Sequence, residues 1–314
     1  MQDQTGRVCV AFNGEIYNHV ALRRELEQQG ARFYTDHADT EVLVQGYLTW
    51  GIDVLLSRLN GIFAFALSDD ELGKTWLVRD QLGIKPLYVG RLGDQIAFAS
   101  EIKALVVPGA IERQLDPAAV RHYLTFMTAP APLTLNACVW KLPAGCLAEC
   151  GDDGSLDVRR YWDCLPQIPR QASDAELAET ARALVEQAIE RQLMSDVPIG
   201  VFLSGGVDSA ALLAIASRYG TVDAFTVGFS DAAELSEVDA ASATAKQFGV
   251  RHHMVTIDAS DAQDYLQRLI HDQDEQSNPR TKPPFGPPGD EPWFALVYAW
   301  RADATPDRPA SASR

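Results

Sequence analysis

Residues 201–209 read VFLSGGVDS, an uncharged apolar run followed by a glycine turn and a polar helix start. The run from Ile199 to Leu203 has the character of a fully buried parallel strand. Ser204-Gly205-Gly206 predicts a turn into a helix, a layout that directs backbone N–H groups and the positive end of a helix dipole toward an anion. Asp208 suits such a site if Mg²⁺ lies between its carboxylate and a phosphate.

The loop is not a Walker loop, because it lacks the Gly-Lys-Ser/Thr ending. SGGVDS instead resembles the pyrophosphate loop of the N-type ATP pyrophosphatases, which activate a carboxylate or carbonyl as an adenylate. The resemblance implies ATP and Mg²⁺ as cofactors, with Mg²⁺ held by Asp208 through the pyrophosphate. It also implies a set of ATP- or pyrophosphate-binding residues: Phe202, Leu203, Ser204, Gly205, Gly206, Asp208 and Ser209. The alternative is an ordinary strand-to-helix turn in which the glycines only relieve crowding.

Composition excludes several classes of function. The chain of 314 residues has 27 basic and 43 acidic side chains, and its net charge of −16 argues against a nucleic-acid or anionic-membrane surface. No apolar run approaches the roughly 20 residues that cross a bilayer, and the first ten residues do not have the pattern of a signal peptide. The five cysteines follow no metal-ligand spacing, which favours reduced thiols and a cytoplasmic location.

The second half of the chain alternates strands and helices. A helix is expected over 173–193, capped by Ser173 or Asp174 and with one buried apolar side, and the pyrophosphate loop follows it. A strand over 223–229, a helix over 236–248 and a strand near 252–255 complete the pattern of an α/β doubly wound parallel sheet, with the nucleotide at the carboxyl ends of the strands. His252 and His253 suggest a metal pair, but adjacent residues of a strand point to opposite faces.

The first half predicts a layered α+β domain. Strands are expected at 8–12, in IFAFALSD, in TWLVRD, near 86–89 and at 95–99, with helices at 21–29 and 41–50. Asn13-Gly14-Glu15 has the composition of a turn, and Asp39 that of a helix cap.

The stretches FNGEIYNH, HADTE, RLNGIFAFAL, VRDQLGIKPLY and FASEIKAL resemble the class II glutaminase domain of glutamine-hydrolysing asparagine synthetases, a family that also carries SGGVDS. The resemblance implies an incomplete N-terminal-nucleophile-type layered sandwich followed by an incomplete ATP-pyrophosphatase domain. It implies Asn13 and Gly14 as the oxyanion hole, and Asn13, Glu15 and Asp39 as glutamine-binding residues. Val227 then contacts adenine, although a core valine is the simpler interpretation. Glu237 resembles an acidic position of the synthetase site.

By this resemblance the reaction converts aspartate, glutamine and ATP to asparagine, glutamate, AMP and pyrophosphate. The family's nucleophile is an N-terminal cysteine, whereas this chain begins MQDQ, so we expect a chain that is truncated at both ends and does not hydrolyse glutamine. The alternatives are a non-catalytic nucleotide- or glutamine-binding remnant, a gene fragment, or a related amidotransferase with another acceptor such as a sugar. A homodimer is left open.

Four segments are expected from these features. Residues 1–112 form the partial amidotransferase domain, 113–172 an interdomain connector, and 173–278 the partial ATP-pyrophosphatase domain. Residues 279–314 read as an atypical tail, rich in proline and without periodicity, that is disordered or frameshifted.

Overall fold

The computed structural model describes residues 1–106, 111–165, 172–195, 197–231, 236–261 and 295–296. Two compact units divide these residues, with the break after residue 165. No helix in the described part of the chain is both long enough and apolar enough to cross a membrane.

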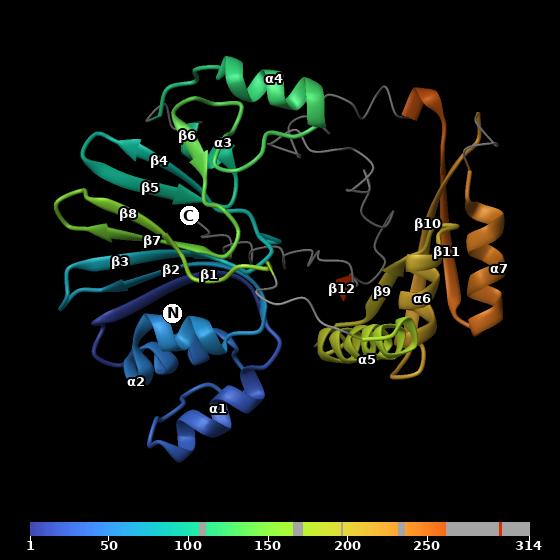
Figure 1. Cartoon of the computed structure of the whole chain (residues 1–314), viewed down its shortest axis with the longest axis horizontal. Helices are drawn as coiled ribbons and strands as arrows, with labels where there is room; N and C mark the ends of the chain where they lie inside the picture. Colours follow the sequence, from blue (N-terminus) through green and yellow to red (C-terminus); the bar gives the residue numbers. More distant parts are fainter. Residues whose placement is uncertain (107–110, 166–171, 196, 232–235, 262–294, 297–314) are drawn as a thin grey trace, which may run out of the picture. The chain divides into compact units, whose positions relative to one another are not determined.

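The first unit is built on a five-stranded antiparallel sheet with the strand order β1-β2-β3-β7-β8. Its strands are β1 (Val8–Ile16), β2 (Gly61–Asp69), β3 (Lys74–Arg79), β7 (Cys146–Gly151) and β8 (Leu156–Arg160). The helices α1 (His19–Gln28) and α2 (Thr40–Arg58) cover one face (Figure 1). Alternate residues of β1, among them Val8 and Val10, pack against these helices because successive strand residues face opposite sides.

A three-stranded sheet covers the other face. It has the order β5-β4-β6 and consists of β4 (Tyr88–Leu92), β5 (Gln95–Ala99) and β6 (Val139–Lys141). Ala64 and Leu77 of the larger sheet share a buried cluster with Val89 of the smaller one. The short helix α3 (Ile102–Val106) packs on the outer face of the smaller sheet, and α4 (Pro117–Phe126) follows it in the chain. The unit is therefore a layered α+β arrangement.

The second unit contains a parallel sheet with the order β11-β10-β9-β12. Its strands are β9 (Ile199–Phe202), β10 (Val222–Phe229), β11 (Arg251–Ile257) and the two-residue β12 (Ala295–Leu296). The helices are α5 (Asp174–Gln192), α6 (Val207–Ala216) and α7 (Val238–Phe248). Apolar residues of α6 and α7, including Leu213 and Ala241, form the core with Val201 and Ala224 of the sheet.

The segment 113–172 differs from the expected connector. It contributes β6 to the smaller sheet of the first unit, and β7 and β8 to the larger one. β7 pairs with β3 over five residues, and Leu147 is fully buried in the core. The first unit therefore extends well beyond residue 112.

Helix α5 corrects a second expectation. Ser173 caps its start as predicted, and it does so in a capping box with Glu176. The predicted buried side is instead mostly exposed: Ile189 is buried, whereas Leu177, Leu184 and Val185 are exposed. Only the C-terminal part of the helix, through Ile189 and Leu193, packs into the core of its unit. Apart from β12, the predicted tail 279–314 lies outside the described residues.

Candidate functional sites

Asn13 and Gly14 lie within strand β1 and not in the turn that their composition suggests. They pair with Ala64 and Phe63 of β2. The backbones approach so closely that a Cβ on Gly14 would lie 2.2 Å from the carbonyl oxygen of Ile62, which is why this position requires glycine. The Asn13 side chain shares its sheet face with Ala64 and therefore turns toward the smaller sheet, where its Nδ2 donates to Ser100 Oγ at 3.1 Å.

Ser100 was assigned no role from the sequence, although it lies in the stretch FASEIKAL. Its hydroxyl follows β5 and reaches Asn13 across 87 residues of chain, so the two sheets meet at this hydrogen bond. The contact occupies one of the two Asn13 N–H donors and fixes the orientation of the amide. The other donor suits a developing oxyanion.

Asp39 occupies the N-cap position of α2 but makes no side-chain cap hydrogen bond, which corrects the predicted cap. Its Oδ2 instead accepts the backbone N–H of Ile16 at 3.0 Å. The structure thus brings Asp39 to the end of β1, three residues beyond Asn13. Glu15 shares the Asn13 face of the strand.

The pKa of Tyr17 reflects its burial and the negative charges near this end of β1. Burial, followed by the negative charges of Glu15 and Asp80, raises the pKa of Tyr17 to about 12. Asp80 is itself buried and accepts backbone N–H groups of Leu82, Ile84 and Lys85 at 2.9–3.0 Å. The carboxylate of Asp80 therefore holds the loop 81–85 through these three hydrogen bonds.

In the second unit, the predicted pyrophosphate loop runs between β9 and α6. Two hydroxyls organise it: Ser204 Oγ lies 2.9 Å from Ser209 Oγ, and Ser209 Oγ accepts the Ser204 backbone N–H at 3.2 Å. Ser204 Oγ also accepts the N–H of Gly206 at 3.1 Å. Gly206 is the N-cap residue of α6 and provides no side-chain cap, and Asp208 in the first turn of the helix is exposed.

The residues of this loop fit an anion and its cation. The uncapped start of α6 offers N–H groups and a helix dipole, and Ser204 and Ser209 add hydroxyls, which together are the donor set of a phosphate site. The exposed carboxylate of Asp208 is an oxygen ligand of the kind that Mg²⁺ prefers. Phe202 ends β9, Leu203 is buried, and Val227 is half-buried in the neighbouring strand β10.

A chain of hydrogen bonds behind the loop fixes its first residue. Thr226 Oγ1 donates to the Leu203 carbonyl at 2.7 Å and lies 2.8 Å from His252 Nε2. Ser242 Oγ of α7 lies 3.3 Å from His252 Nδ1. Burial, followed by the charge of His253, lowers the pKa of His252, so its ring is neutral at pH 7 and joins β10, β11 and α7.

The two histidines of the suggested metal pair have different partners. His252 contacts Thr226 and Ser242, whereas His253 Nε2 lies 2.9 Å from Asp223 and its ring stacks on Phe225. Their side chains therefore lie on opposite faces of the sheet, as strand geometry requires.

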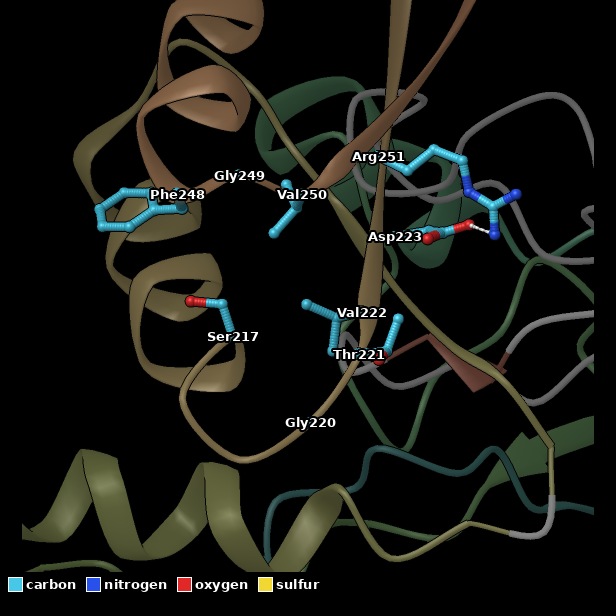
Figure 2. Close-up of a pocket in the computed structure, with 9 residues that line it drawn as sticks. All are labelled: Ser217, Gly220, Thr221, Val222, Asp223, Phe248, Gly249, Val250 and Arg251. Carbon is cyan, nitrogen blue, oxygen red and sulfur yellow. Dashed lines mark ion pairs between the residues drawn. The ribbon is translucent and has the colours of Figure 1, made fainter.

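Figure 2 shows a pocket of about 380 Å³ at the other edge of the parallel sheet. It lies at the amino ends of β10 and β11, where Arg251 reaches over to pair with Asp223 at 2.9 Å. The predicted pyrophosphate loop follows the carboxyl end of β9, so this pocket is separate from that loop. It is lined by Ser217, Gly220, Thr221, Val222, Asp223, Phe248, Gly249, Val250 and Arg251.

Two protein families match the chain in succession. The family model of a glutamine amidotransferase domain matches residues 1–162, and that of asparagine synthase matches residues 180–304. The first match includes β6, β7 and β8, in agreement with their place in the first unit. The second continues past residue 278, where the sequence suggested an atypical tail.

Curated relatives include several asparagine synthetases. The glutamine-hydrolysing asparagine synthetase 1 of Bacillus subtilis is 34% identical over 87% of this chain and 43% of its own length. The putative asparagine synthetase of Mycobacterium tuberculosis H37Rv is 36% identical over 86% of this chain and 42% of its own length. Asparagine synthetase B of Escherichia coli is 31% identical over 83% of this chain and 44% of its own length. This chain thus spans less than half the length of these relatives.

Among solved structures, the glutamine phosphoribosylpyrophosphate amidotransferase of Bacillus subtilis in complex with ADP and GMP has a TM-score of 0.39 at 20% identity. It covers 81% of this chain and 47% of its own.

Proposed function

We propose that this chain, which belongs to the glutamine amidotransferase family and carries an asparagine synthase domain after it, takes part in ATP- and glutamine-dependent amide transfer to aspartate. The observation that carries the proposal is the loop between β9 and α6, where hydroxyls, backbone N–H groups and one exposed carboxylate meet at an uncapped helix start. That combination suits Mg²⁺–pyrophosphate better than an ordinary turn.

In the proposed reaction, the second unit activates the acceptor. The first turn of α6 and the hydroxyls of Ser204 and Ser209 bind the phosphates, and Val227 contacts adenine. Asp208 would hold Mg²⁺ at this loop, and the cation would supply positive charge beside the phosphates. The aspartate side chain attacks the α-phosphate, pyrophosphate leaves, and ammonia then displaces AMP from the acyl phosphate to give the amide.

In the first unit, the proposed roles follow from where the side chains lie. The second N–H of Asn13 and the backbone N–H of Gly14 donate to the side-chain carbonyl oxygen of bound glutamine, and Ser100 holds the Asn13 amide in place. We assign no nucleophile from this chain, in keeping with the expectation that it does not hydrolyse glutamine. Asp39 and Glu15 accept the α-ammonium group. Asp39 is positioned for this by its hydrogen bond to Ile16, because the bond fixes the carboxylate at the end of β1.

A cytoplasmic setting is part of the proposal. All five cysteines are free thiols, as expected of a reducing compartment.

Calorimetric titration of the full chain with ATP in the presence of Mg²⁺ tests the proposal. We expect binding by the wild type that weakens at least about tenfold in Asp208→Asn, since one carboxylate–cation contact is lost. Asp239→Asn is the matched control, because it removes the same charge from the first turn of α7. A folded chain that does not bind ATP, or binds equally well in Asp208→Asn, contradicts the proposed site.

A further inference from the structure

An acidic side chain occupies the pyrophosphate loop in the structure. Glu237 Oε2 accepts the backbone N–H of Gly205 at 3.1 Å. Glu237 is the N-cap residue of α7, yet its side chain makes no cap hydrogen bond to its own helix. The carboxylate therefore reaches the loop between β9 and α6 instead of capping the start of α7.

The contact is close because Gly205 lacks a side chain. A Cβ at this position would lie 3.4 Å from Glu237 Cβ and 3.3 Å from Ala240 Cβ. The glycine thus lets the start of α7 approach the loop backbone. Both Gly205 and Glu237 are exposed, so an incoming anion can reach this N–H group.

A carboxylate oxygen and a phosphate oxygen each accept a hydrogen bond, so both compete for the Gly205 N–H. One N–H group cannot serve both at full strength, and two negative groups on one short loop repel each other. An anion that enters alone therefore meets both a filled donor and a like charge. An anion that enters with a divalent cation brings the charge that offsets Glu237.

We propose that Glu237 is a specificity-determining residue of the pyrophosphate loop. Its carboxylate holds the Gly205 N–H in the free protein and yields it to a phosphate oxygen only when a divalent cation accompanies the phosphate. The loop thus selects metal-chelated polyphosphates over metal-free anions. This inference rests on the proposed function, because it concerns the same nucleotide site.

Calorimetric titration with inorganic pyrophosphate, with Mg²⁺ or with EDTA, tests the role of Glu237 on the full chain. Glu237→Gln keeps the shape of the side chain and removes its charge. We expect it to tighten metal-free pyrophosphate binding up to about tenfold, the factor that corresponds to a like-charge pair in contact at a solvent-exposed position. The gain in affinity from Mg²⁺ should shrink by a similar factor. Asp239→Asn, two residues along the same helix, should change both affinities less than about twofold.

The possible results separate this inference from the proposed function. Metal-free affinity that is unchanged or weaker in Glu237→Gln overturns the inference and leaves the nucleotide site standing, provided that the wild type binds Mg²⁺–pyrophosphate. A shift of equal size in Asp239→Asn also overturns it, because the effect is then a general one of net charge. No binding of pyrophosphate by any folded variant, with or without Mg²⁺, overturns both.

Discussion

At the scale of single residues, buried carboxylates anchor the first unit. Asp69 is almost completely buried and accepts two hydrogen bonds from Arg7, at 3.0 and 2.9 Å, and one from Tyr47 at 2.8 Å. The hydrogen bonds from Arg7, which outweigh the opposing effect of burial, lower the pKa of Asp69 to about 2, with a further contribution from Tyr47. The bonds tie the first residues of the chain to the end of β2 and to α2.

Asp69 should make the stability of the first unit sensitive to acid. Its folded-state pKa lies below the unfolded value near 3.9, so its stabilisation is full above about pH 4 and is lost as the pH falls toward 2. The loss amounts to about 2 kcal/mol. Urea unfolding of the wild type and Asp69→Asn between pH 2 and 7 measures it: the variant should be less stable at neutral pH and should lack this acid transition. The exposed Asp70→Asn is the control, and an equal effect there would contradict the assignment.

Thr226 is the residue through which the sheet fixes the nucleotide loop. Thr226→Val keeps the shape of the side chain but leaves the Leu203 carbonyl and His252 without their partner. We expect a loss of about 1–3 kcal/mol in the free energy of unfolding, together with weaker Mg²⁺–ATP binding. Chemical denaturation and calorimetry measure the two effects. The same change at the exposed Thr256 should affect neither, and a stable, fully binding Thr226→Val would show that the hydrogen-bond chain is dispensable.

At the scale of elements, the close pairing of β1 with β2 positions Asn13. Gly14→Ala should prevent this pairing locally, because the new Cβ would overlap the Ile62 carbonyl. We expect a loss of about 3 kcal/mol, at the upper end of the usual cost of overpacking. Gly220→Ala is the matched control, since nothing lies within 4 Å of its Cβ position. Circular dichroism during urea unfolding compares the two, and a Gly14→Ala protein as stable as the control would refute the steric account.

Local signals in the sequence predicted the elements better than their partners. Ser173 caps α5 as expected, because its hydroxyl accepts the N–H of Glu176 close by in the chain. The composition of the Asn13-Gly14 pair predicts a turn, whereas the structure places the pair within β1. The two differ because composition is a local signal, and the partner strand β2 lies about 50 positions later in the chain.

The site residues show the same division. The glycines and serines of SGGVDS were identified from their order alone, since the strand–turn–helix layout is local. The contacts of Ser100 with Asn13 and of Glu237 with Gly205 join residues that are 87 and 32 positions apart. Hydrophobic periodicity carries no information about pairs so distant in the chain. The place of β6 to β8 in the first unit has no local signal for the same reason: β6 and β7 pair with β4 and β3, which lie far back in the chain, and β8 joins the sheet through β7.

At the scale of the whole molecule, the chain divides into two units with separate cores. The antiparallel unit carries the residues that resemble a glutamine site, and the parallel unit carries the predicted pyrophosphate loop. Ligands of one unit should therefore stabilise that unit first, because binding stabilises the folded state that holds the site.

Amide hydrogen–deuterium exchange of the full chain, with and without Mg²⁺–ATP, tests the central claim most directly. It reports which backbone N–H groups become protected when the ligand binds. The account predicts slower exchange over residues 203–209 and at the start of α7, where Glu237 releases Gly205, with little change in residues 1–160. Unchanged exchange at 203–209 under saturating Mg²⁺–ATP, or protection confined to the first unit, would contradict it.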